Sequence, residues 1–153
     1  MPGSSGRPRV ILLVEDDQGD QELTRRALQR LPVRHHLEVV ANGEDALDYL
    51  CRRGHFAEAV RPDLVLLDLN LTGLDGKQVL QRLRAEPALV GLPVVCLTTS
   101  SQDDDVRQSY RLGANSYIAK PASMEGFSAL VEAVHHYWFD TVLLPDGGKS
   151  DGT

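Results

Sequence analysis

Polar residues follow four short apolar runs of this chain, and their types suit the chemistry of phosphate and of metal ions. They are Glu15, Asp16, Asp68, Thr98 and Lys120. Carboxylates bind hard divalent cations, whereas a hydroxyl and an ammonium can each hold a phosphoryl oxygen. Together these groups indicate a phosphoryl-transfer site.

The three carboxylates would repel one another if they shared a cleft without a cation. Mg²⁺ is the natural partner, because it typically takes one or two carboxylates together with a phosphate. Asp68 would then lie beside the metal and act as the nucleophile, since aspartate is a known phosphoryl acceptor. The Lys120 ammonium and the Thr98 hydroxyl would each take one phosphoryl oxygen.

Five strands and five helices are predicted to position these residues. Runs rich in Val, Leu and Ile predict strands at Val10–Val14, Leu37–Ala41, Leu64–Leu67, Val94–Leu97 and Tyr117–Ala119. Helical spacing predicts helices around residues 19–31, 46–50, 79–83, 102–112 and 127–138. The alternation predicts an α/β fold with a doubly wound five-stranded parallel sheet, of which the common order is 2-1-3-4-5. The polar residues then meet at one edge, where the carboxyl ends of the strands lie.

Each of these residues also has a simpler explanation when it is taken alone. Asp17 is favoured as the N-cap of the following helix, and Asp68 would be ordinary in a loop. Thr98 could merely end a strand, and Lys120-Pro121 could be a surface turn. These explanations require independent coincidences at one sheet edge, so the pattern as a whole favours a functional cleft.

Composition excludes several classes of protein. The 153 residues are 42% hydrophobic and carry a net charge of −6, which fits one globular domain and not a nucleic-acid-binding surface. The longest apolar run, Val10–Val14, is too short for a membrane span and lacks a signal-peptide cleavage site. Cys51 and Cys96 are too few for a disulfide scaffold or zinc cluster. A cytoplasmic protein is therefore expected.

The residues and their order resemble the receiver domain of two-component response regulators. The matching motifs are Ile-Leu-Leu-Val-Glu-Asp-Asp, Pro-Asp-Leu-Val-Leu-Leu-Asp, Leu-Asp-Gly, Pro-Val-Val-Cys-Leu-Thr and Ala-Lys-Pro. The match covers residues 9–138, between an N-terminus (1–8) that is expected to be mobile and a C-terminal extension (139–153). The resemblance implies a flavodoxin-like receiver fold and a phosphoacceptor that assists its own phosphorylation and dephosphorylation, not an enzyme.

The resemblance assigns a role to each acidic residue of the site. Asp68 would be the phosphoacceptor and would also contact Mg²⁺. Asp16 would bind Mg²⁺ directly and Glu15 through water, while Asn70 would contribute its backbone carbonyl. The side chain of Asn70 would matter less.

The remaining roles concern the phosphoryl group and the conformational switch. By the same resemblance Thr98 and Lys120 would bind phosphoryl oxygens, and the Lys120–Pro121 peptide bond would be cis. Tyr117 would be the aromatic switch that turns inward when the Thr98 hydroxyl moves to the phosphate. The chain departs from the family pattern at two places. Thr72-Gly73 should loosen the loop after the acceptor strand, and Thr99 should narrow the access of small phosphodonors to the site. Neither departure removes a catalytic group.

Two segments narrow the expected subtype and partners. The stretch from Tyr49 to Pro62 and the ending from Tyr137 to Pro145 resemble the small response regulators that partner phytochrome-type histidine kinases. Too few residues follow Pro121 for a DNA-binding domain, so a stand-alone receiver that signals through protein contacts is expected. The apolar part of the extension, Trp138–Pro145, is expected to mediate a homodimer or dock a partner, or to fold back. A dimer through the fourth helix, fifth strand and fifth helix is an alternative.

Two other functions compete with this interpretation. Asp68-Leu69-Asn70-Leu71-Thr72 differs at one position from the Asp-x-Asp-x-Thr motif of haloacid dehalogenase-type phosphatases. That position supplies the general acid, and Asn cannot donate a proton in this way. The second competitor is a receiver-like binding module that works without phosphorylation.

Overall fold

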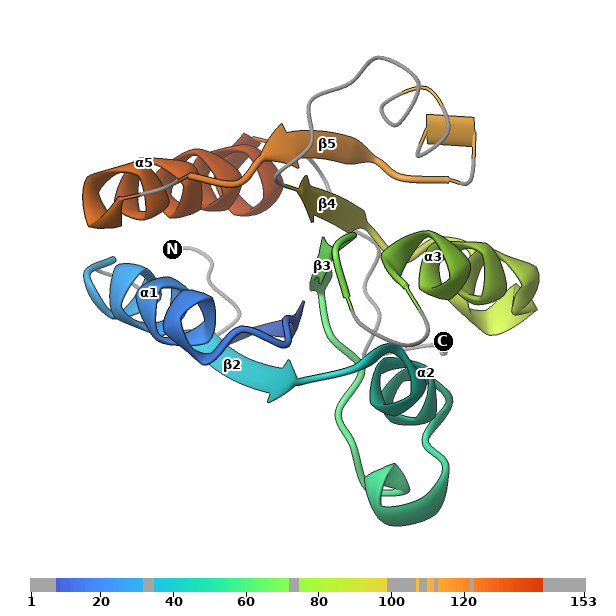
Figure 1. The fold of residues 1–153 in the computed structure, drawn as a ribbon. Coiled ribbons are helices and arrows are strands. Elements are labelled where there is room, and N and C mark those ends of the chain that lie inside the picture. Colours follow the sequence, from blue (N-terminus) through green and yellow to red (C-terminus); the bar gives the residue numbers. More distant parts are fainter. Residues whose placement is uncertain are drawn as a thin grey trace.

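The computed structural model describes residues 8–31, 35–71, 75–98, 107, 110–111, 113–121 and 123–141. Within them, parallel strands form one sheet in the order β2-β1-β3-β4-β5, as predicted (Figure 1). The strands are β1 (Arg9–Val14), β2 (His35–Val40), β3 (Leu64–Asp68), β4 (Val94–Thr98) and β5 (Ser116–Ala119). Their ends lie at most two residues from the predicted ones.

Four of the predicted helices lie in the described part of the chain. They are α1 (Gln18–Gln29), α2 (Gly43–Cys51), α3 (Gly76–Ala85) and α5 (Met124–His135). The helix predicted at 102–112 falls largely outside the described residues. The described residues in this range, Arg107, Tyr110 and Arg111, are helical. Short 3-10 turns, η1 (Gly54–Phe56) and η2 (Pro87–Leu89), precede β3 and β4.

A polar side chain caps the start of each of these four helices. The Asp17 carboxylate accepts a hydrogen bond from the Asp20 N–H at 3.0 Å, which confirms the N-cap interpretation of Asp17. Asn42, Asp75 and Ser123 cap α2, α3 and α5 in the same way. These caps satisfy backbone N–H groups that have no partner inside the helix. The four caps follow β1, β2, β3 and β5, so the helices begin on the side of the sheet where these strands end.

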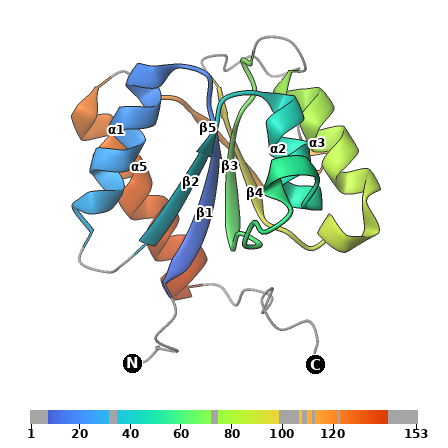
Figure 2. The ribbon, with the colours of Figure 1, turned by 90° about the horizontal axis from the view of Figure 1, so that it is seen from below.

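Helices cover both faces of the sheet, with α1 and α5 on one side and α2 and α3 on the other (Figures 1 and 2). An apolar core lies on each side of the sheet, and alternate residues of β1 contribute to the two. Leu12 and Val14 pack towards α2 and α3, whereas Ile11 and Leu13 pack towards α1 and α5. Burial of both faces explains why the central strands are continuously apolar.

Arg84 of α3 links the loops that lead into β4 and β5 through hydrogen bonds. Its guanidinium donates hydrogen bonds to the carbonyl oxygens of Leu92 and Gly113 and to Asn115 Oδ1, at 2.8, 3.0 and 2.9 Å. Asn115 Oδ1 also accepts from the Val94 N–H at 2.8 Å. This network fixes the start of β5, the strand that leads to the site lysine.

The chain stays helical beyond α5. A π-helical segment, η3 (His136–Thr141), continues it past residue 138, where the receiver was expected to end. Trp138 is partly buried against the α1–α5 core, and residues 142–145 of the expected apolar extension lie outside the described part. Among the described residues, no helix is both long and apolar enough to cross a membrane.

Candidate functional site

The predicted site residues converge at the carboxyl edge of the sheet. Glu15 directly follows β1, Asp68 and Thr98 end β3 and β4, and Lys120 directly follows β5. Backbone hydrogen bonds hold these ends together, including Lys120 N–H to the Thr98 carbonyl at 2.7 Å. Glu15, Asp68 and Thr98 are at most 2% exposed, so the chemistry lies in a cleft shielded from bulk water.

Three carboxylates surround the ammonium of Lys120. Its Nζ lies 2.7 Å from Asp20 Oδ2, 2.9 Å from Glu15 Oε1 and 3.0 Å from Asp68 Oδ2. The lysine side chain is 8% exposed. A buried charge is tolerated only when it is paired, and these carboxylates provide the pairing.

Burial and crowding change the proton affinity of both partners. Burial raises the pKa of the Glu15 carboxyl, and the neighbouring Asp68 raises it further. Burial by itself lowers the pKa of Lys120, but the hydrogen bonds to Asp20, Glu15 and Asp68 together hold that pKa above its ordinary value. The ammonium therefore keeps its proton at neutral pH, and the crowded acids favour a further positive charge.

Glu15, Asp16 and Asp68 form a candidate cation site. One carboxylate oxygen from each lies within 4.8 Å of the others. Such a set of oxygen donors fits a hard divalent ion such as Mg²⁺ that keeps some of its waters. The raised pKa of Glu15 supports the fit, since a nearby cation would stabilise its charged form.

Asn70 contacts both the Asp68 carboxylate and the Thr98 hydroxyl. Its backbone N–H donates to Asp68 Oδ1 at 2.9 Å, and its side-chain Oδ1 accepts from the Thr98 hydroxyl at 2.9 Å. The sequence predicted that Asn70 would contribute its backbone carbonyl and that its side chain would matter less. The structure shows that the Asn70 side chain also contributes, because its hydrogen bond fixes the orientation of the Thr98 hydroxyl.

A hollow of about 130 Å³ lies beside this group. Its lining residues are Leu69, Asn70, Asp75, Lys77, Thr98 and Tyr117. Thr98 and the predicted switch residue Tyr117 therefore share one cavity, although they come from neighbouring strands.

One expectation about the site is wrong, and others fall outside the described residues. The described peptide bonds contain no cis bond, so Lys120–Pro121 is trans and the general preference of peptide bonds holds here. The departures at Thr72-Gly73 and Thr99 lie outside the described part.

Sequence reasoning missed two residues of the site. Asp20 makes the shortest ion pair to Lys120, and the only signal for it was an acid in the first turn of a helix that begins near the cleft. Gly76 lies against the acceptor strand, since a Cβ there would be 2.5 Å from the Asp68 carbonyl oxygen and the Leu69 Cα. The Leu-Asp-Gly motif contains this glycine, but the motif does not reveal how closely Gly76 approaches Asp68.

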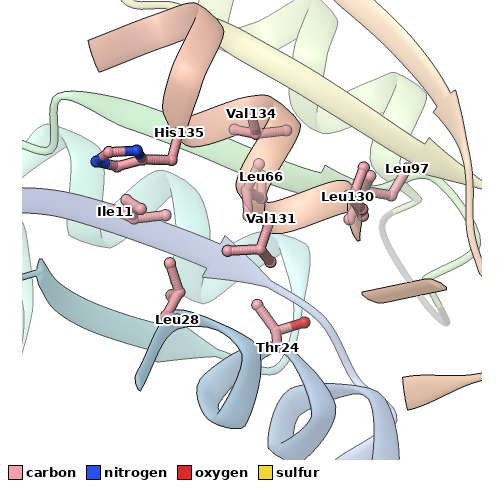
Figure 3. Close-up of a pocket in the computed structure, with 9 residues that line it drawn as sticks. All are labelled: Ile11, Thr24, Leu28, Leu66, Leu97, Leu130, Val131, Val134 and His135. Carbon is pink, nitrogen blue, oxygen red and sulfur yellow. The ribbon is translucent and has the colours of Figure 1, made fainter. Parts of the chain in front are cut away.

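A second cavity lies between α1, α5 and the sheet, away from the carboxylates (Figure 3). Leu130, Val131 and Val134 of α5 face Thr24 and Leu28 of α1 across it. Its volume of about 10 Å³ and apolar lining make it a packing void and not a ligand site.

The fold and the cleft define a receiver domain. The sequence model of the response regulator receiver domain matches residues 11–135, and the chain belongs to this family. Its members are phosphoacceptors rather than classical enzymes, so the haloacid dehalogenase-type phosphatase is not retained.

Among characterised relatives, the chain resembles phytochrome response regulators. It is 39% identical to Response regulator Rcp1 of Synechocystis sp., over 95% of this chain and 99% of that protein. The phosphorylated cyanobacterial phytochrome response regulator RcpA matches with a TM-score of 0.87 at 40% identity, over 92% of this chain and 100% of RcpA. The Mn²⁺-bound form of Rcp1 matches with a TM-score of 0.84 at 39% identity, over 90% of this chain and 99% of that one.

Proposed function

We propose that this chain accepts a phosphoryl group on Asp68 from a phytochrome-type histidine kinase, in a reaction that needs Mg²⁺. The carrying observation is the convergence of Asp68 with Glu15, Asp16 and Lys120 in one buried cleft. This is the set of groups that phosphoryl transfer requires, because the reaction depends on positioning and on neutralising oxygen charge.

In the proposed reaction an Asp68 carboxylate oxygen forms a bond to phosphorus, and the phosphorus–nitrogen bond of the donor phosphohistidine breaks. Glu15, Asp16 and Asp68, with the Asn70 carbonyl, would hold Mg²⁺, which would supply positive charge to neutralise the phosphoryl oxygens. Lys120 Nζ, now 3.0 Å from Asp68 Oδ2, transfers its hydrogen bond to a phosphoryl oxygen. Its positive charge opposes the charge that the phosphoryl group brings.

The switch would begin at Thr98. In the present state its hydroxyl donates to Asn70 Oδ1, and phosphorylation would offer a charged oxygen that accepts more strongly. When Thr98 leaves Asn70, the shared cavity changes shape and the Tyr117 ring can turn inward. The signal is then a shift between two states of the surface around β5 and α5.

The phytochrome link and the output are also parts of the proposal. The phytochrome response regulators named above support a bacteriophytochrome as the kinase. We further propose a cytoplasmic protein that signals through protein contacts, with a homodimer through the fourth helix, β5 and α5 or through Trp138–Pro145. Phosphotransfer profiling against the histidine kinases of the source genome identifies the kinase, and size-exclusion chromatography with light scattering tests the dimer.

The central experiment supplies acetyl phosphate and Mg²⁺ and detects the acyl phosphate by intact-protein mass spectrometry. We expect one labile phosphoryl group on the native protein, none on Asp68→Asn, and none when the metal is chelated. Asp48→Asn is the matched control, because this exposed carboxylate is paired with Arg53 and lies outside the cleft. Stoichiometric labelling of Asp68→Asn would refute the assignment, and no labelling of the native protein would favour the phosphorylation-independent module.

A further inference from the structure

Asp20 touches the site lysine but does not belong to the candidate cation site. Its Oδ2 atom lies 2.7 Å from Lys120 Nζ, the shortest of the three ion pairs. The carboxylates that could share a cation are those of Glu15, Asp16 and Asp68. Asp20 therefore has a different task from these acids.

A divalent cation and the Lys120 ammonium compete for the same carboxylates. An ammonium has three N–H donors, and Glu15 and Asp68 accept two of them in the present state. A cation bound to Glu15 and Asp68 would weaken their ion pairs with Lys120, and the cation and the ammonium would repel each other. Of the three ion pairs of Lys120 with Asp20, Glu15 and Asp68, the one with Asp20 does not involve a candidate cation ligand.

The backbone of Asp20 is fixed independently of Lys120. Its N–H donates to the Asp17 carboxylate at 3.0 Å, and its carbonyl accepts from the Thr24 hydroxyl at 2.9 Å. The side chain is 23% exposed, whereas those of Glu15 and Asp68 are 2% exposed. Asp20 thus presents a carboxylate to Lys120 from the rim of the cleft, on a rigid first helical turn.

We propose that Asp20 is a positioning residue that keeps the Lys120 ammonium in the cleft once a divalent cation is bound there. It allows two positive charges to act on one phosphoryl group, the cation from one side and the ammonium from the other. This proposal rests on the proposed function, since it concerns the same acceptor and the same cation.

The first test uses Mn²⁺ alone and measures its binding by electron paramagnetic resonance, without a phosphodonor. In Asp20→Asn one negative charge is lost, and the Lys120 ammonium is left to pair with Glu15 and Asp68, where it competes with the cation. Mn²⁺ should therefore bind about three- to tenfold more weakly. Glu22→Gln on the same helix is the control, because it removes the same charge at an exposed pair with Arg26. The control should bind Mn²⁺ as the native protein does. Unchanged Mn²⁺ affinity in Asp20→Asn would overturn the proposal.

A second background separates positioning from simple charge. In Lys120→Met there is no ammonium to hold, so adding Asp20→Asn should cost much less Mn²⁺ affinity than it does in the native protein. Equal losses in both backgrounds would mean that Asp20 acts on the metal only through space, and the positioning role would be wrong.

Phosphorylation by acetyl phosphate gives a third, independent readout. Asp20→Asn should raise the half-saturating Mg²⁺ concentration and also lower the maximal initial rate, while Asp20→Glu should restore part of both. A maximal rate equal to that of the native protein would contradict the proposal. If the native protein accepts no phosphoryl group, the proposed function fails, whereas the Mn²⁺ measurements still decide the role of Asp20 towards Lys120.

Discussion

At the residue scale, the polar side chains of Asp68, Thr98 and Lys120 are already hydrogen-bonded within the cleft. Asp68 accepts from Asn70 at one oxygen and from Lys120 at the other. Thr98 donates to Asn70. These bonds hold the side chains within reach of an incoming phosphoryl group, so little rearrangement is needed when it arrives.

The two cysteines should differ sharply in reactivity. Burial raises the pKa of the Cys96 thiol to about 12, so at pH 8 only about one molecule in ten thousand carries the reactive thiolate there. Cys51 is half-buried at the end of α2. A thiol-specific chromophoric disulfide should modify one thiol of the folded protein and two after denaturation. Cys51→Ser should leave none reactive in the fold, and rapid modification of that variant would contradict the burial of Cys96.

Gly76 should be intolerant of any side chain. A Cβ at this position would lie 2.5 Å from the backbone of Asp68 and Leu69, so Gly76→Ala must displace the acceptor strand or α3. We expect a loss of unfolding free energy of about 1–3 kcal/mol and slower phosphorylation by acetyl phosphate. Gly91→Ala is the control, because a Cβ there meets no atom within 4 Å. Equal stability of the two variants in urea denaturation would show that the close approach is absent.

At the element scale, α1 and α5 pack on the same face of the sheet through a shared apolar cluster. Arg30 of the α1 C-cap donates to Ser128 of α5 at 3.1 Å, but both groups are at the surface. The contact depends mainly on the residues around the void in Figure 3. This matters for the proposed function because α5 begins at Met124, four residues after Lys120.

Truncation of one of these residues should therefore destabilise the fold. Val131→Ala removes two methyl groups beside an existing void, and the unfolding free energy should fall by about 2 kcal/mol. Val60→Ala is the control, because that side chain is 57% exposed and its removal should change stability by less than about 0.5 kcal/mol. Urea denaturation of both variants gives the comparison. A Val131→Ala variant as stable as Val60→Ala would mean that the α5 interface is not a main source of stability.

At the scale of the whole molecule, stability and function meet at the acidic edge of the sheet. Glu15 and Asp16 follow β1 and Asp68 ends β3, and the mutual repulsion of their carboxylates opposes the packing that brings these strands together. A cation bound to the folded state would relieve this repulsion.

Mg²⁺ should therefore raise the thermal midpoint. At a free concentration 100 times the dissociation constant, binding adds about 2.7 kcal/mol, which corresponds to several degrees for a domain of this size. Asp16→Asn should lose the response, and Asp48→Asn should keep it. Differential scanning calorimetry with and without Mg²⁺ makes the comparison. A full response in Asp16→Asn would mean that the ion binds elsewhere.

The sequence by itself determined the sheet, its order and the edge at which the chemistry lies. Unbroken apolar runs mark strands buried on both faces, and parallel strands must end at a common edge, so Glu15, Asp68, Thr98 and Lys120 could be brought together before any coordinates were known. Only the tertiary structure decided which atoms touch. The Asp20–Lys120 pair and the approach of Gly76 to Asp68 depend on packing distances between separate elements. Periodicity in a sequence fixes the face and the edge of an element, but it carries no information about the spacing between elements.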